Sequence, residues 1–149
     1  MPIANINYKA TVQGELFSEI NFKSYQYVHD TGEFKIIFFK SGKCRIMGCK
    51  RPLCRKIIAF SSCLKIRVQR IQSITFTHDL QRTINLFKLS KSSYMIQYEP
   101  EIFPAARLMD FRPLCVNVFA SGKIVITGLR TLQFQKTMSL ILCRLLTLL

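Results

Sequence analysis

Residues Tyr98–Pro104 read YEPEIFP, and residues Phe119–Gly128 read FASGKIVITG. The second stretch has the pattern of a β-hairpin, because Gly122 supplies the backbone freedom that a tight turn needs and the residues after it alternate in type. The stretch Phe39–Gly48, FKSGKCRIMG, has a similar pattern 80 residues earlier. The occurrence of the same hairpin pattern twice in a chain of 149 residues indicates an internal duplication.

The remaining pattern predicts an α+β domain in which helices cover one face of a curved antiparallel sheet and leave the other face free. The domain spans residues 1–149, with a shortened first repeat at 1–62 and a second repeat at 63–149. Strands are predicted at 3–12, 34–40, 44–48, 64–72, 114–119 and 123–128, and helices at 52–61, 79–89 and 131–148. Pro52, near the first turn, marks the start of the first helix, and Thr77 and Asp79 are candidate caps for the second.

Charge is the strongest compositional signal. Lys and Arg number 22 against 8 acidic residues, a net charge of +14, which favours a polyanionic partner. Nucleic acid is the first candidate, an anionic membrane surface the second, and a solvated surface without a partner the third. The apolar segment 138–149 is too short to span a bilayer and is predicted to be a core helix.

Neither a metal site nor an enzyme is predicted. The six cysteines contain no C-x-x-C pair, and the two histidines form no zinc-like array with them. We therefore expect reduced thiols in an intracellular protein, packed mostly as small apolar groups, and no cofactor. No phosphate-binding loop or recognisable catalytic constellation is present.

The two quoted stretches resemble the second half of the TATA-box-binding protein family, whose repeats carry Y-E-P-E-L-F-P and F-x-S-G-K-x-V-x-T-G. The resemblance implies a saddle of two pseudo-symmetric repeats with helices on its convex face. It also implies a transcription initiation factor that binds an A/T-rich promoter through the minor groove, bends it, and recruits a IIB-like factor and RNA polymerase. Such a factor acts in the nucleus or another intracellular site of transcription, and the shortened first repeat suggests a viral or other fast-evolving lineage.

Alternation along the strands assigns side chains to the two sheet faces. If Phe34, Ile36 and Phe38 enter the core, then Ile37 and Phe39 lie on the open face. The resemblance implies that Phe103, Phe119 and Phe39 are wedges between base steps. Other matching positions imply base, sugar or phosphate contacts. The full predicted DNA-binding set is Asn5, Ile37, Phe39, Lys43, Arg45, Met47, Lys50, Phe103, Asn117, Phe119, Lys123, Val125, Thr127 and Arg130.

The acidic pair Glu99 and Glu101, with Ile102 beside it, is predicted to contact a basic protein partner, which in this family is factor IIB. Several positions depart from the family pattern. The first half lacks an N-P-x-x-F segment, Val68 stands where an asparagine is expected, and Arg45 and Met47 replace valine and threonine. Two alternatives therefore stay open: a repurposed saddle that binds protein, and a basic single-strand binder.

Overall fold

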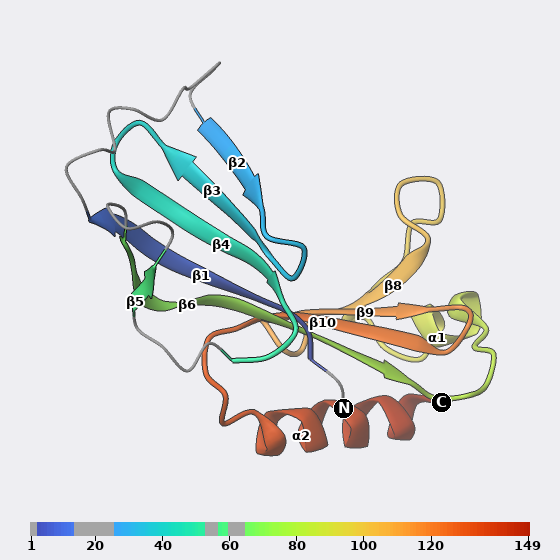
Figure 1. Ribbon diagram of the computed structural model, residues 1–149. Coiled ribbons are helices and arrows are strands. Elements are labelled where there is room, and N and C mark those ends of the chain that lie inside the picture. The colour runs from blue at the N-terminus through green and yellow to red at the C-terminus, as the bar shows by residue number, and fades with distance from the viewer. Residues whose placement is uncertain (1–2, 14–25, 53–56, 60–64) are drawn as a thin grey trace. The chain divides into compact units, whose positions relative to one another are not determined.

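The computed structural model describes residues 3–13, 26–52, 57–59 and 65–149, which divide into two compact units. The first unit covers Ile3–Ile74. Its strands are hydrogen-bonded in the order β2-β3-β4-β1-β6, and β5 also pairs with β6 (Figure 1). Their bounds are β1 Ile3–Gln13, β2 Gln26–Asp30, β3 Lys35–Phe39, β4 Lys43–Cys49, β5 Ile57–Ala59 and β6 Lys65–Asp79.

The second unit covers Thr75–Leu149 and begins within the last residues of β6. Its strand order is β6-β10-β9-β8-β7, and α2 lies along one face of these strands (Figure 1). Helix α2 buries Met138, Ile141 and Leu145, and the Phe134 ring lies 4.1 Å from that of Phe76. The elements after β6 are α1 Leu86–Lys91, β7 Ile96–Gln97, β8 Ala105–Leu108, β9 Cys115–Phe119, β10 Lys123–Leu129 and α2 Gln135–Leu148.

The predicted helix over 52–61 is wrong, because Ile57–Ala59 forms strand β5 and pairs with Lys65–Arg67 of β6. Ile57 and Ile58 are β-branched and favour an extended backbone, and the pairing with β6 outweighs the helix-start signal of Pro52. Residues 53–56 and 60–61 of that prediction lie outside the described part of the chain.

Three other boundaries were misplaced, and one of them is the start of the second helix, since α1 covers Leu86–Lys91 and not the predicted 79–89. Strand β6 continues seven residues beyond the predicted end at Gln72, so Thr77 and Asp79 lie in a strand and do not cap a helix. The cap of α1 is Asn85, whose side chain accepts a hydrogen bond from the Lys88 amide at 2.9 Å. Helix α2 begins at Gln135, four residues after the predicted start at Thr131. The hairpin strands lie within one or two residues of their predicted bounds.

Candidate nucleic-acid interface

The two hairpins share one register. In the first-half hairpin (β3–β4), Ile37 lies opposite Arg45, and in the second-half hairpin (β9–β10), Asn117 lies opposite Val125, each 80 residues later. Both turns have a glycine at positive φ: 77° at Gly42 and 87° at Gly122. Each glycine amide donates to the carbonyl of the preceding phenylalanine, Phe39 or Phe119, at 3.0 and 2.9 Å. The duplicated sequence pattern therefore folds into two equivalent hairpins.

Each hairpin has one buried and one open face. The buried side chains are almost completely inaccessible: Ile36, Phe38, Cys44 and Ile46 in the first half, and Val116, Val118, Ile124 and Ile126 in the second. The neighbours between them are half-buried or exposed: Ile37, Phe39, Arg45, Met47, Asn117, Phe119, Val125 and Thr127. The predicted alternation is confirmed within the strands, but Phe34, which was expected in the core, is half-buried and lies before β3. An apolar surface left open on a sheet is typical of a binding face.

Two aromatic rings meet at the second-half hairpin. The ring of Phe103, from the loop before β8, lies 6.1 Å from that of Phe119 in an edge arrangement, and Phe103 remains 39% exposed. Arg107 of β8, opposite Asn117, donates from Nε to the Asn117 side-chain oxygen at 3.5 Å. Lys123 and Arg130, before and after the apolar part of β10, are exposed. This second-half face thus combines paired apolar rings with one cation on the face, Arg107, and two cations at its margin.

The first-half hairpin has the same phenylalanine with a different neighbour. The Arg45 guanidinium carbon lies 5.9 Å from the centre of the Phe39 ring. Strand β1 places Lys9 opposite Arg45 and Thr11 opposite Lys43. Lys43, Arg45 and Lys50 are exposed. On this first-half face a cation therefore lies directly beside the phenylalanine ring.

Two asparagines of β1 occupy the same face as Lys9. Asn5 is half-buried, and its side-chain oxygen accepts a hydrogen bond from the Gly48 amide at 2.8 Å. Asn7 donates to the Ser73 hydroxyl at 3.2 Å, and its buried side-chain oxygen has no partner among the described residues. Asn7 was not predicted as a site residue. The alternation with buried Ile6 and Tyr8 was the signal that placed it on this face.

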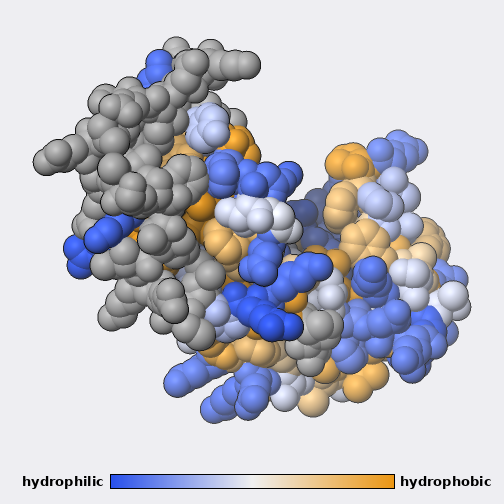
Figure 2. Space-filling model, viewed as in Figure 1, coloured by the Kyte–Doolittle hydropathy of each residue, from blue (hydrophilic) through white to orange (hydrophobic). Residues whose placement is uncertain are grey.

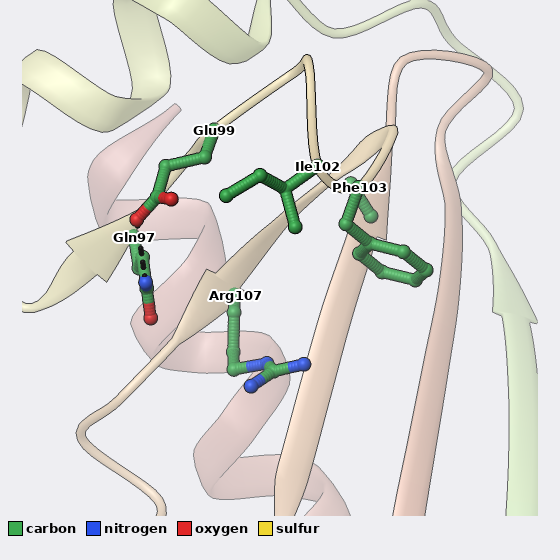
Figure 3. A pocket seen from close by; sticks show the side chains of 6 residues that line it. Gln97, Glu99, Ile102, Phe103 and Arg107 are labelled. Atoms are coloured by element: carbon green, nitrogen blue, oxygen red, sulfur yellow. Dashed lines mark hydrogen bonds between the residues drawn. The ribbon is translucent and has the colours of Figure 1, made fainter.

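The segment Tyr98–Pro104, the acidic loop, projects from the start of β8 (Figure 1). The Glu99 carbonyl accepts from the amides of Ile102 and Phe103 at 3.0 and 2.9 Å, and its carboxylate accepts from the Gln97 side chain at 2.7 Å (Figure 3). Ile102 is 79% exposed, and Glu101 is also exposed. Hydrophobic and hydrophilic atoms lie side by side at the loop tip (Figure 2). The hydrogen-bonded turn thus presents carboxylates next to an apolar side chain.

A pocket of about 110 Å³ lies under this loop, between Glu99, Ile102, Phe103 and Arg107 (Figure 3).

The described cysteines show no sign of a reactive or metal-binding site. Burial raises the pKa of the Cys44 and Cys49 thiols to about 11, so both stay protonated at neutral pH and pack as apolar groups. The described residues contain no cluster of His, Cys, Asp and Glu suited to a metal ion. The four cysteines among them carry free thiols.

Residues 68–148 match the model of a family described as transcription factor TFIID, or TATA-binding protein. The chain belongs to this family. It is 30% identical to TATA-box-binding protein 3 of Methanosarcina acetivorans, over 78% of this chain and 71% of that protein. It is 34% identical to the TATA-box-binding protein of Tetrahymena thermophila, over 67% of this chain and 47% of that protein.

The fold agrees with this membership. The solved TATA-binding protein of Methanococcus jannaschii superposes with a TM-score of 0.71, covering 99% of this chain and 98% of that one at 23% identity. The predicted fold class is therefore confirmed. The family consists of transcription factors and not of enzymes, which confirms that the chain is not an enzyme. None of the helices in the described residues is long and apolar enough to cross a membrane.

Proposed function

We propose that this chain is a transcription initiation factor that binds A/T-rich promoter DNA through the minor groove, bends it, and recruits a IIB-like factor and RNA polymerase. It would act in the nucleus or another intracellular site of transcription. The observation that carries the proposal is the Phe103–Phe119 ring pair on an open sheet face. Apolar side chains inserted between base steps unstack them and kink the duplex.

Charge supplies the affinity in this proposal. The net charge of +14 favours a polyanion, and Lys43, Lys50, Lys123 and Arg130 are exposed cations at the turns and ends of the two hairpins. Phosphate contacts release counterions and position the protein, whereas the half-buried Val125 and Thr127 meet the groove floor. In the proposed factor, the first repeat covers residues 1–62 and the second covers residues 63–149.

The double variant Phe103→Ala, Phe119→Ala tests the wedge. A duplex selected from random sequences is the probe, and its bend is measured by fluorescence energy transfer between its ends. We expect the bend to disappear and affinity to fall at least about tenfold, since stacking is worth roughly 1–3 kcal/mol per base. The matched control is Phe87→Ala, which removes a 67% exposed ring from α1 outside the proposed interface. Unchanged bending in the double variant would favour the alternative in which this face binds protein.

The acidic loop is the proposed contact for the IIB-like factor. Changing Glu99 and Glu101 to arginine reverses the charge of the acidic loop from negative to positive and leaves the residues of the two hairpin faces unchanged. We expect DNA affinity to be retained and the supershift by purified transcription factor IIB to be lost. A variant that loses DNA binding instead would show that this loop lies in the DNA interface.

A further inference from the structure

We propose that the first-half hairpin reads a narrow minor groove, of the kind that A-tracts form, by inserting Arg45, and that Phe39 serves as a platform for this guanidinium and not as a wedge. The proposal rests on the proposed function, since it requires the open faces to meet duplex DNA. It assigns the two hairpins different tasks on one DNA molecule.

The equivalent phenylalanines have different neighbours. Phe119 lies edge-on to Phe103, which adds a second apolar ring to the same surface. Phe39 lies against the exposed Arg45 guanidinium at 5.9 Å, a distance at which the ring face attracts a cation. Arg45 occupies the position equivalent to Val125. A ring covered by a charged group is poorly suited to slide between bases, but an aromatic face is a good surface for a planar guanidinium to stack on.

Among the described residues, no carboxylate forms an ion pair with Arg45. Lys9 lies directly opposite Arg45 across the β1–β4 ladder, and like charges in that arrangement are destabilising. Within the described segments, neither of these two side chains forms an ion pair. The ion pairs recorded there are Lys35–Asp30 and Arg144–Asp110. Two neighbouring cations on an open face, neither with an ion-pair partner in the described segments, favour an anionic ligand with a concentrated negative potential.

A narrow minor groove has this property. Its walls bring phosphates of both strands close together, which strengthens the negative potential and attracts inserted arginine. A-tracts are stiff and keep the groove narrow, whereas T-A steps are easily kinked and opened. Arg45 should therefore favour an A-tract under the first half, while the ring pair Phe103–Phe119 favours a deformable step under the second half.

Three duplexes of equal length test this preference. The first joins an A-tract to alternating T-A steps, and the second has alternating T-A steps throughout. The third repeats the first with 2,6-diaminopurine in place of the A-tract adenines, which places an amino group in the minor groove. Fluorescence anisotropy gives the dissociation constants for the full chain and for Arg45→Val, which copies the second-half residue. Phe39→Leu removes the ring but keeps apolar volume, and Lys136→Gln removes one exposed cation on α2 as the charge control.

We expect the unmodified chain and Lys136→Gln to bind the first duplex about tenfold more tightly than the other two. A factor of this size corresponds to one good contact in the groove. In Arg45→Val and Phe39→Leu this ratio should fall to about one. If Arg45→Val weakens binding to all three duplexes equally, Arg45 contacts phosphate and the groove-reading proposal is wrong. A ratio that survives in Arg45→Val also overturns it. Absence of binding to any duplex would instead overturn the proposed function.

Discussion

The first-half and second-half hairpins have the same turn and the same register but present different chemistry. At the equivalent sheet position the first has Arg45 next to Phe39, and the second has Val125 near a pair of apolar rings. Their buried faces are alike in being wholly apolar, although the first half has the aromatic Phe38 where the second half has Val118. The comparison shows that the buried face preserves the duplicated fold, while the open face is where the two copies have diverged.

The turns also differ in how they are held. The carbonyls of Gly122 and Ala120 accept hydrogen bonds from the amides of Leu80 and Ile84 at 3.1 and 2.8 Å, which fastens the second-half turn to the segment before α1. In the first-half turn, the Gly42 carbonyl accepts a hydrogen bond from the Val12 amide of β1 at 3.0 Å. The second-half turn is therefore the more constrained of the two.

The largest expected effect comes from Gly122→Ala. A Cβ at Gly122 would collide with the Arg82 backbone carbonyl, and its φ of 87° is already unfavourable for alanine. We expect a loss of about 3 kcal/mol of unfolding free energy, from the left-handed backbone and the collision together. Urea unfolding, followed by circular dichroism, measures this loss.

Two matched glycines provide the control for that measurement. Gly42 and Gly32 have φ values of 77° and 86°, but a Cβ at either would meet nothing within 4 Å. Their alanine variants should lose only about 1 kcal/mol, the backbone cost alone. Equal losses at Gly42 and Gly122 would mean that the segment before α1 gives way easily and that the second-half turn is not specially constrained.

These contrasts mark the limits of prediction from sequence. The hairpins were predicted correctly because glycine turns and alternating side chains are local patterns. Strand β5 was missed because its pairing with β6 joins separate segments, and the sequence gives no local sign of that partner. The length of β6 was underestimated because polar residues such as Ser73 and Thr75 hide its alternation with the buried Ile74 and Phe76.

At the candidate site, too, local patterns could be predicted and contacts between strands could not. Alternation was enough to place Phe39, Phe119 and Val125 on open faces. The Phe39–Arg45 contact could not be predicted, since a diagonal contact between strands depends on register and side-chain rotamer. Likewise, Asn5 was expected to be available for bases, yet its side-chain oxygen already accepts from the Gly48 amide. Roles in DNA binding remain predictions for every residue of the set.

A smaller effect concerns the ion pairs of the two units. Arg144 of α2 contacts Asp110 at 2.7 Å with both side chains partly buried, whereas Lys35 contacts Asp30 at 3.6 Å with both largely exposed. Arg144→Met should cost about 1 kcal/mol of unfolding free energy, because a close and partly desolvated pair exceeds a surface pair in strength. Lys35→Met should leave the urea midpoint unchanged. A larger shift from Lys35→Met than from Arg144→Met would contradict this ranking.

The smallest expected effect is also the most direct test of whether both hairpins touch one duplex. Lys43 and Lys123 are exposed at equivalent positions directly after the two turn glycines. Each change to glutamine should lower the slope of log affinity against log salt by about 0.9, the value for one phosphate contact, and weaken binding only a few-fold. Because a phosphate contact is insensitive to the groove chemistry that separates the hairpins, the two variants should behave alike. If the slope changes for Lys123→Gln alone, the first-half hairpin lies away from the DNA. Lys9 and Arg45 would then need another anionic partner.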